Sequence, residues 1–537
     1  MTDDVKQMYS VLRDELKNDL LEFGVKNPET IQLILDNLFE PQKYIEIPAK
    51  KLSNKENSLF QVDRDILRSK REMYYRNNIN SMFLNNNQKS FSVNKKYLKL
   101  VSDLFKLSKE QSQGVEDSIH NQFFILTGGP GTGKTTTAAS ILFYHLLSGI
   151  SADKILIAAP TGRAAGRITE SIQNSFKSLL LNNKFEISRD SLISFKATTI
   201  HRLLSYSYAK NKFYKNRDNP LMVDLLIVDE ASMLSPELFS SICEALPVTS
   251  RFILLGDSYQ LPPVDSEKLF FPLLEGKYSE NKPFHKEITY NFRSKSSPDL
   301  DSFLTSIKKR EPSFLNSAKW SLYNEETKDD FFSSLSEDPP KITFVDNSFF
   351  SDKVLYEQFW KSYREFVLKK KLDASLYKSS TEGLWDNVIS YQILTSLKKN
   401  GRESSNEIND YMETGINKRD WIVPKIMTYN NYSLGVFNGD IGVERNGTYL
   451  FTIESTTKSI PTNTPGIETA FAITVHKAQG SQYENTIIVL PNDPNSELNT
   501  NEMLYTAVSR AMKNVMILST RETIEKAILG DRVLKDN

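Results

Sequence analysis

Short apolar runs occur in two groups along the chain, and those of the first group each end at a Gly, Pro or Asp and are followed by a stretch with helical spacing. The first group is QFFILTG at 122, KILIAAP at 154, LLIVD at 225 and RFILLGD at 251; the second is AFAITVH at 470, NTIIVLP at 485 and NVMIL at 514. Continuous apolar runs of this length are typical of strands buried on both faces of a parallel sheet. The pattern predicts an α/β protein with two lobes, each built on a parallel sheet.

The N-terminal segment has the spacing of helices, as in Ile34 and Leu38, and a polar, basic stretch at residues 85–96 marks its end. We therefore expect a small helical domain over residues 1–100, followed by the first lobe over residues 101–275.

The second lobe is predicted over residues 276–423 and 469–537. Ser297 should open one of its helices as an N-cap ahead of a proline. Two Asn-Gly turn signals separate short β-type runs within residues 424–468, which indicates a small β module inserted in this lobe. Residues 311–380 show no pattern that we can assign.

Composition limits the picture without naming a function. A chain of 537 residues is long enough for two to four domains. Lys plus Arg equals Asp plus Glu at 67 each, so any nucleic-acid contact must come from a local basic surface. Cys243 is the only cysteine, which excludes an internal disulfide and fits a reducing compartment. With no export signal and no long apolar span, we expect a cytoplasmic protein that makes no use of a membrane.

The strongest chemical signal is GGPGTGKT at 128–135, between an apolar strand and an apolar-striped helix. Such a loop lets backbone N–H groups wrap phosphates, while Lys134 reaches the β- and γ-phosphates and Thr135 offers a hydroxyl to Mg²⁺. The alternative, a chance glycine-rich turn, is disfavoured by the flanking strand and helix. The expected nucleotide-binding residues here are Gly128, Gly129, Pro130, Gly131, Thr132, Gly133, Lys134, Thr135 and Thr136.

Asp229 and Glu230 follow the buried strand LLIV. Carboxylates are costly to bury there unless they serve a cation or a water. We predict that Asp229 holds Mg²⁺ and that Glu230 orients and deprotonates the attacking water. A strand-ending acidic pair is also compatible with a solvated loop, but this pair follows the P-loop lysine by about 95 residues, as in a P-loop ATPase.

Phosphoryl transfer also needs positive charge at the transition state. Arg293 in ITYNFRS and Arg510 in LYTAVSRA are the candidates, although any single arginine can be a plain surface charge. If both reach ATP from the second lobe, hydrolysis is coupled to closing and opening of the cleft.

The order of the motifs resembles that of superfamily 1 helicases. The strings are GGPGTGKTTT, AAPTGRAA, TTIHRLL, LLIVDEASML, LLGDSYQLPPV, ITYNFRS, TVHKAQGSQ and YTAVSRA, spread over residues 107–518. The resemblance implies two RecA-like P-loop lobes. It also implies that Gln111 reads adenine and that Gln260 senses the γ-phosphate. The residues that it assigns to the single-strand path are Pro160, Thr161, Gly162, Arg163, Thr199, His201, Thr474, His476 and Lys477. For His201 and His476, a hydrogen-bonded core histidine is the open alternative.

Finer matches resemble the RecD-type helicases, the alpha subunits of exodeoxyribonuclease V. NNYSLGVFNGDIGV at 430–443 is similar to the start of their SH3-like insertion. The resemblance implies an ATP- and Mg²⁺-dependent 5′-to-3′ helicase that acts on single-stranded DNA and duplex ends in recombinational repair. It further implies a heterotrimer with RecB-like and RecC-like subunits, in which the N-terminal domain docks a partner and a partner subunit carries the nuclease.

Other interpretations stay open. A stand-alone RecD-like helicase usually carries a longer N-terminal extension than the roughly 105 residues found here. An RNA helicase of the same superfamily is disfavoured because no cysteine-rich zinc module is present. A subunit that binds DNA or a partner without hydrolysing ATP is disfavoured because the catalytic residue types are all present.

Overall fold

The computed structural model describes most of the chain after residue 90 and part of the segment before it. The described residues are 17, 47–48, 60–63, 66–86, 91–180, 192, 195–207, 209–263, 269–277, 283–292, 297–324, 331–336, 341–368, 388, 390–414, 416, 421–431, 433–453 and 456–530. Much of the helical domain predicted over residues 1–100 lies outside them.

Helix α3 (Lys70–Asn86) of the N-terminal segment packs on the first lobe. Strands β1 (Ile47–Pro48), β2 (Phe60–Asp63) and β3 (Ile66–Ser69) form an antiparallel sheet ahead of this helix. Ile79 of α3 is fully buried against α10 (Pro236–Ala245), and Asn78 donates a hydrogen bond to the Ser240 hydroxyl at 3.0 Å. Helix α3 is therefore part of the outer layer of the first lobe.

A six-stranded sheet forms the first lobe, and all its pairings are parallel. Its spatial order is β11 (Phe284–Ile288), β4 (Phe123–Gly128), β10 (Arg251–Gly256), β9 (Leu225–Val228), β5 (Ile155–Ala159) and β6 (Thr198–Thr199). Successive side chains of a strand point to opposite faces. Phe124 and Leu126 accordingly join one apolar cluster, and Phe123 and Ile125 join another. Both faces are covered, which is why this strand reads as a continuous apolar run.

Helices cover the two faces of this sheet. One face carries α4 (Lys95–Leu104), α5 (Lys109–His120), α6 (Lys134–Leu147) and α7 (Gly162–Leu180). The other carries α3, α9 (Ile200–Leu203), α10 and α11 (Phe270–Glu275). A short hairpin of β7 (Tyr206–Ser207) and β8 (Lys212–Phe213) follows α9.

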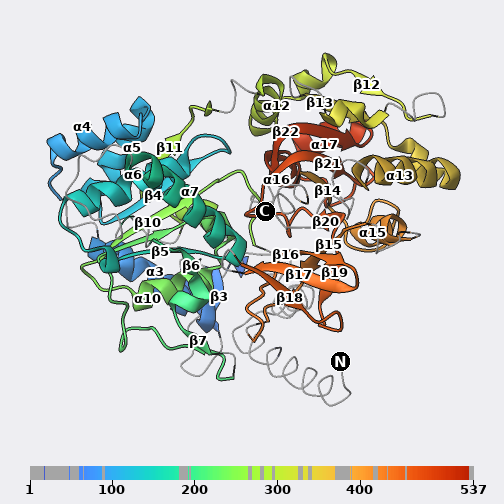
Figure 1. The fold of residues 1–537 in the computed structure, drawn as a ribbon. Coiled ribbons are helices and arrows are strands. Elements are labelled where there is room, and N and C mark those ends of the chain that lie inside the picture. Colours follow the sequence, from blue (N-terminus) through green and yellow to red (C-terminus); the bar gives the residue numbers. More distant parts are fainter. Residues whose placement is uncertain are drawn as a thin grey trace.

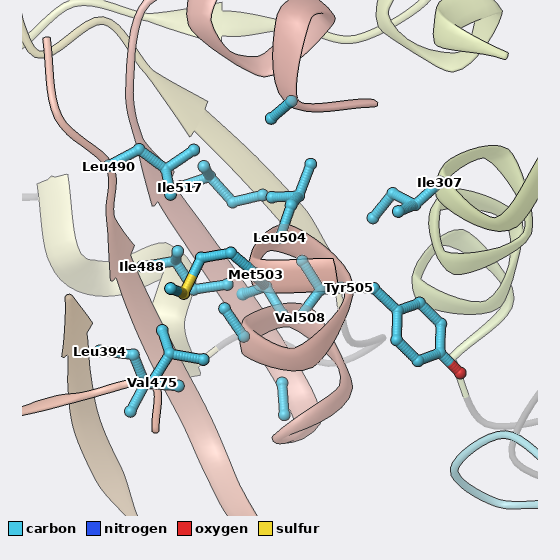
Figure 2. Close-up of a cluster of buried hydrophobic side chains, with 14 of the residues drawn as sticks. Ile307, Leu394, Val475, Ile488, Leu490, Met503, Leu504, Tyr505, Val508 and Ile517 are labelled. Atoms are coloured by element: carbon cyan, nitrogen blue, oxygen red, sulfur yellow. The ribbon is translucent and has the colours of Figure 1, made fainter. Parts of the chain in front are cut away.

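The second lobe repeats the architecture, as Figure 1 shows. Its parallel sheet has the order β12 (Trp320–Ser321), β13 (Ile342–Val345), β22 (Ala511–Leu518), β21 (Tyr483–Val489), β14 (Tyr391–Thr395) and β20 (Ala472–Thr474). Helices α12 (Pro298–Lys309), α16 (Asn501–Ser509) and α17 (Arg521–Leu529) pack on one face, and α13 (Lys353–Val367) and α15 (Ser405–Glu413) pack on the other. Figure 2 shows the first of these two cores, with Leu504 and Val508 of α16 against Ile488 and Ile517 of the sheet.

Helix α12 begins at Pro298, as predicted, and buries Leu300, Phe303 and Ile307. Ser297 occupies the N-cap position, as predicted, but it has φ −146° and ψ 71° and its side chain makes no capping hydrogen bond. Pro298 restricts the backbone of the residue before it.

Inserted in the second lobe is a five-stranded antiparallel sheet, β15 (Val423–Met427), β16 (Ile441–Arg445), β17 (Thr448–Ile453), β18 (Thr456–Ile460) and β19 (Ile467–Thr469). Asn446 and Gly447 join β16 to β17, and both have positive φ, 50° and 69°. A two-residue hairpin turn with both central residues in that region prefers this Asn-Gly pair. The fold class expected from the sequence is thereby confirmed: two parallel-sheet lobes and an antiparallel insertion. Across the described residues, no helix combines the length and apolar character needed to span a membrane.

Candidate active site

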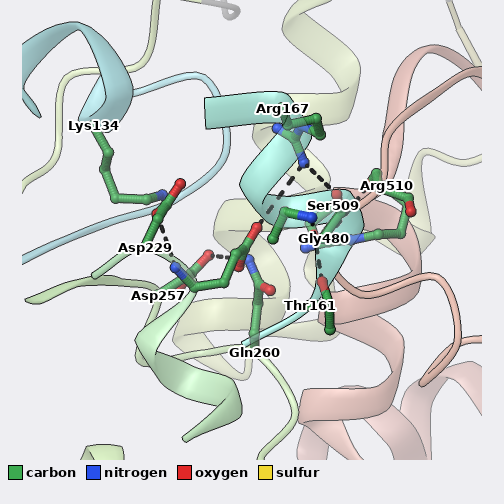
Figure 3. A network of polar contacts seen from close by, with 12 residues as sticks. Lys134, Thr161, Arg167, Asp229, Asp257, Gln260, Gly480, Ser509 and Arg510 are labelled. Carbon is green, nitrogen blue, oxygen red and sulfur yellow. Dashed lines mark hydrogen bonds and ion pairs between the residues drawn. The ribbon is translucent and has the colours of Figure 1, made fainter. Parts of the chain in front are cut away.

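The loops that carry the predicted chemistry leave the carboxyl ends of parallel strands. The P-loop follows β4, Asp229 follows β9, and Asp257 follows β10. In open α/β sheets, ligands bind in the crevice beyond these strand ends. Here α16 and the loop after β20 face that crevice from the second lobe (Figure 3).

The P-loop has the backbone conformation that its glycines allow. Gly131 and Gly133 have φ of 79° and 80°, a region where a side chain would be strained. Gly133 precedes α6, so the N–H groups at the start of this helix face the loop. The Lys134 ammonium donates hydrogen bonds to the carbonyls of Gly128 at 2.6 Å and Gly129 at 3.1 Å. Partial burial lowers the pKa of Lys134, an effect that nearby carboxylates oppose.

Gln111 is buried and lies against the P-loop. Its side chain completes a capping box with Ser108 at the start of α5, and its amide also donates to the carbonyl of Thr132 at 3.2 Å. A Cβ placed on Gly133 would lie 2.3 Å from the Gln111 Nε2. The amide is therefore held against the same loop that would wrap the phosphates.

Two aromatic side chains stand on the same side of the loop. Tyr290 and Phe292 are 45% and 44% exposed, and their rings lie 4.8 Å apart. The Phe292 N–H donates to the carbonyl of Gly131 at 3.0 Å. Glu110 accepts hydrogen bonds from the N–H groups of Thr289 and Tyr290, which lowers the pKa of its carboxyl. An exposed aromatic face beside an amide suits a planar base.

The acidic pair lies opposite Lys134. Burial, together with the neighbouring Glu230, raises the pKa of Asp229 to about 6. Glu230 has φ 52° and ψ 42°, the left-handed region that residues other than glycine rarely occupy. Such a strained backbone is common at functional sites, and the Glu230 carboxylate lies 4.0 Å from the guanidinium of Arg167.

Asp257 and Gln260 are the third group of polar residues that the first lobe contributes to the crevice, after the P-loop and the acidic pair. The Gln260 amide donates to the Asp257 Oδ2 at 3.1 Å, and Gln260 Oε1 is buried without a hydrogen-bond partner. An unsatisfied buried acceptor at a strand-end loop calls for an explanation, and a ligand in the crevice supplies one.

Arg510 reaches the crevice from the second lobe. It is 2% exposed and donates to the carbonyls of Thr506 and Ser481 and to the hydroxyl of Ser509. Burial lowers its pKa, while the charge of Glu230 opposes that change. The other predicted arginine, Arg293, lies outside the described residues.

The donor set fits a magnesium nucleotide. Hydroxyl and carboxylate oxygens, which Thr135 and Asp229 offer, are ligands that Mg²⁺ accepts, and Mg²⁺ is commonly shared with substrate phosphates. The P-loop cradle at Gly133, where a Cβ would collide with Gln111, leaves room only for backbone N–H groups.

The residues predicted to line the single-strand path fall in two groups that lie on facing edges of the lobes. Pro160, Thr161, Gly162 and Arg163 follow β5. Thr199 ends the neighbouring strand β6 and His201 follows it, while Thr474 ends β20 and His476 and Lys477 follow that strand. A Cβ placed on Gly480 would lie 3.5 Å from the Thr161 hydroxyl, so the two groups meet where the lobes touch.

Individual positions in these groups differ in their surroundings. The His201 ring packs on Tyr206 and Phe213 of the short hairpin, with centroids 5.4 and 5.7 Å away, and burial lowers its pKa. Lys477 pairs with Glu468 at 3.0 Å. Aromatic packing thus holds His201 in place.

The β insertion also touches the first lobe. A Cβ on Gly162 would lie 3.5 Å from the ring of Phe437, and the Arg202 guanidinium stands 5.7 Å from the centre of that ring. Arg163 stacks on Tyr483 at 5.3 Å and donates to its hydroxyl at 3.2 Å. The first lobe therefore contacts both the second lobe and its insertion at this edge.

Several residues of the site were not singled out from the sequence. Asp257 had a signal, since it ends the apolar run RFILLGD. Arg167 donates to the carbonyl of Gly480 at 3.1 Å, and Tyr505 donates to Asp257 Oδ2 at 3.0 Å. Each of these two hydrogen bonds joins a residue of the first lobe to a residue of the second. No local pattern could therefore have indicated Arg167 or Tyr505.

Comparisons with known proteins agree with this geometry. Residues 111–266 match a family model described as an AAA domain, and residues 469–518 match a UvrD-like helicase C-terminal domain. A RecBCD enzyme subunit RecD from Buchnera aphidicola subsp. Schizaphis graminum is 29% identical over 473 residues, covering 80% of this chain and 76% of the relative. Its counterpart from Haemophilus influenzae is 29% identical over 460 residues, covering 78% and 70%.

Two further matches are more distant or shorter. An ATP-dependent RecD2 DNA helicase from Deinococcus radiodurans is 36% identical over 160 residues, which is 30% of this chain and 19% of that protein. A crystal structure of a Bacteroides Pif1 helicase with ADP-AlF3 and single-stranded DNA has 18% identity and a TM-score of 0.42, covering 78% of this chain and 94% of that one.

The matched helicase domains bind ATP through the P-loop. Together with the long matches to RecD subunits, they show that this chain is an ATP-dependent DNA helicase that is similar to RecD subunits over most of its length.

Proposed function

We propose that the chain moves 5′ to 3′ along single-stranded DNA and serves as the RecD subunit of a RecBCD-type helicase–nuclease acting on double-strand break ends. The observation that carries the proposal is the crevice itself. The P-loop, the acidic pair and the buried Arg510 face one another across the lobes there, and Thr161 and Gly480 lie next to it at the same interface. A change at the nucleotide can thereby move the edges that face DNA.

The chain's own residues have distinct roles in hydrolysis. Thr135 and Asp229 would hold Mg²⁺, which would neutralise charge on the phosphates. Glu230 orients the attacking water and takes its proton, and Arg510, with Arg293, supplies positive charge opposite the γ-phosphate. Gln260 donates to the γ-phosphate through its amide NH2 group, which also donates to Asp257, so that the nucleotide is linked to Asp257.

The other end of the nucleotide lies near Gln111. The Gln111 amide reads the adenine edge, and the half-exposed rings of Tyr290 and Phe292 offer a face for the base. Glu110 accepts hydrogen bonds from the backbone of Thr289 and Tyr290. It therefore holds in place both the ring that would face the base and the segment of chain that leads into the second lobe.

Single-stranded DNA follows the edge at which the lobes meet. Pro160 to Arg163, Thr199 and His201 contact it from the first lobe, and Thr474, His476 and Lys477 contact it from the second. Backbone contacts and base stacking, with little sequence preference, suit a motor that must accept any sequence. The β insertion, predicted as residues 424–468, borders this path because Phe437 touches Gly162 and Arg202.

Relatives support the assignment to a complex. The RecBCD subunits match over more than two thirds of their own length, whereas the RecD2 helicase matches over 19% of its length. We infer RecB-like and RecC-like partners in the cytoplasm, docking through the segment predicted as residues 1–100, with DNA cutting left to the RecB-like subunit. A stand-alone RecD-like helicase is the second candidate, and the RecD2 match favours it.

The test is ATP hydrolysis by the purified chain with and without single-stranded DNA, joined to unwinding of duplexes with a 5′ or a 3′ overhang. We expect stimulation by DNA and unwinding only from the 5′ overhang. Unwinding from the 3′ overhang alone would contradict the polarity. Full unwinding activity without partners, and no association with co-expressed RecB-like and RecC-like subunits, would favour the stand-alone candidate.

A further inference from the structure

A lysine of the second lobe, Lys308, lies against the P-loop. A Cβ placed on Gly129 would stand 3.0 Å from its ammonium and 3.1 Å from the hydroxyl of Tyr505. Lys308 occupies the last turn of α12, and the apolar residues of this helix bury it in the core of the second lobe. Its ammonium therefore crosses the interface between the lobes.

Aromatic rings hold the Lys308 side chain in that direction. The ammonium lies 4.8 Å from the centre of the Tyr259 ring, which belongs to the first lobe, and 5.5 Å from that of Tyr505, which belongs to the second. Each ring face attracts a cation. The two rings thus fix a long side chain that would otherwise be free to extend into solvent.

Two ammonium groups meet at Gly129 as a result. Lys134 donates a hydrogen bond to the Gly129 carbonyl at 3.1 Å, and a Cβ on Gly129 would stand 3.0 Å from the Lys308 ammonium. Like charges placed together inside a crevice are unfavourable unless an anion lies between them. The P-loop lysine meets the β- and γ-phosphates of a nucleotide. The base end is marked by Gln111 at Gly133, on the other side of the loop.

We propose that Lys308 is a further nucleotide-contacting residue, a cation from the second lobe that binds the terminal phosphate of ATP beside Lys134. The proposal rests on the ATP-driven motor described above and deepens it. Because Lys308 belongs to the second lobe, its contact with the terminal phosphate draws the lobes together in the ATP state and is released when that phosphate leaves.

The experiment compares Lys308→Met with Lys309→Met in the full chain. Methionine keeps the apolar stem of the lysine and removes its charge. Lys309 is the next residue of α12 and is exposed, so its substitution makes the same charge change away from the P-loop. Binding of a slowly hydrolysed ATP analogue, ATPγS, and of ADP is measured for each by fluorescence with a labelled nucleotide, without DNA.

The loss of a charged hydrogen bond predicts that Lys308→Met weakens ATPγS binding about 10- to 100-fold, weakens ADP binding less than about 3-fold, and that Lys309→Met changes neither. Lys308→Arg should recover most of the ATPγS affinity. An unchanged ATPγS affinity in Lys308→Met overturns the proposal. So does an equal loss for ATPγS and ADP that Tyr259→Leu reproduces, since that result assigns Lys308 to a structural clip between the lobes.

Failure of the broader function would look different. A wild-type chain that binds ATPγS but unwinds only from a 3′ overhang would sink the proposed polarity, while the comparison of Lys308 and Lys309 variants would keep its meaning.

Discussion

The hydrogen bond from Tyr505 to Asp257 joins the two lobes at the bottom of the crevice, and its removal should separate stability from turnover. Tyr505 is fully buried, and its hydroxyl donates to the Asp257 Oδ2 at 3.0 Å. Burial and the Asp257 carboxylate raise the pKa of Tyr505, so it stays a donor across the working pH range. Phenylalanine at this position keeps the ring and deletes only the donor.

The magnitude follows from the partners that Asp257 retains. A hydrogen bond to a charged group contributes about 1.5–3 kcal/mol. Asp257 also accepts from the Tyr259 N–H at 3.1 Å and from the Gln260 amide at 3.1 Å, so the lower end applies. We expect Tyr505→Phe to lower the free energy of unfolding by about 1.5 kcal/mol. Because Asp257 also positions Gln260, kcat for DNA-stimulated hydrolysis should fall about 10-fold, with KM for ATP nearly unchanged.

Tyr144→Phe is the matched control. Tyr144 is also buried, and its hydroxyl accepts a hydrogen bond from the Asn94 N–H at 2.8 Å, within the outer helices of the first lobe. This variant should lose comparable stability in a denaturant titration and keep the kcat of the wild type. If both variants show the same kcat, Tyr505 contributes only to stability, and the argument that it supports hydrolysis by holding Asp257 beside Gln260 is refuted.

Three more outcomes can be checked. Glu230→Gln should bind ATP and DNA normally but hydrolyse ATP about 10²- to 10⁴-fold more slowly, because the general base is lost; near-normal turnover in a steady-state assay would remove Glu230 from that role. Gly133→Ala should abolish ATP binding in a nucleotide titration, since its Cβ would lie 2.3 Å from the Gln111 amide. The control is Gly149→Ala, at φ 90° with no atom within 4 Å, which should cost only about 1–2 kcal/mol of backbone strain. Equal ATP affinity in the two variants would contradict the role of Gly133 in the P-loop. Burial raises the pKa of Asp440 from near 3.8 to about 6, so the wild-type fold loses stability as pH rises through that window. Asp440→Asn should therefore be more stable than wild type by up to about 3 kcal/mol at pH 8 and equally stable near pH 4. A difference in unfolding free energy that does not change with pH would speak against a buried charge.

The sequence predicted the strands that are buried on both faces, because their apolar runs are local and continuous. QFFILTG contains β4 (Phe123–Gly128) and RFILLGD contains β10 (Arg251–Gly256). It missed β6 (Thr198–Thr199), a two-residue strand that exists through its pairing with β5. Helix α13 (Lys353–Val367) lay in the stretch without an assigned pattern, although Tyr356, Trp360 and Tyr363 have helical spacing and Asp352 caps the helix. That signal was present and was overlooked.

The chemistry of the nucleotide site also follows from local patterns. A phosphate-wrapping loop needs glycines at set positions, and the acidic pair needs a strand end, so Lys134, Asp229 and Glu230 could be named from the sequence alone. Ser297 could likewise be placed at the N-cap of α12 from the local sequence, although its side chain makes no capping hydrogen bond.

The sequence by itself therefore determined which segments become buried strands, where the phosphates of a nucleotide would bind and which family of motors the motifs resemble. Only the tertiary structure decided which side chains of the second lobe meet that site. Tyr505 reaches Asp257 across 248 residues of chain, and Lys308 reaches Gly129 from a helix with no motif of its own. Such contacts depend on how two separately formed cores pack against each other, and the relative position of two packed bodies leaves no periodic trace in either sequence.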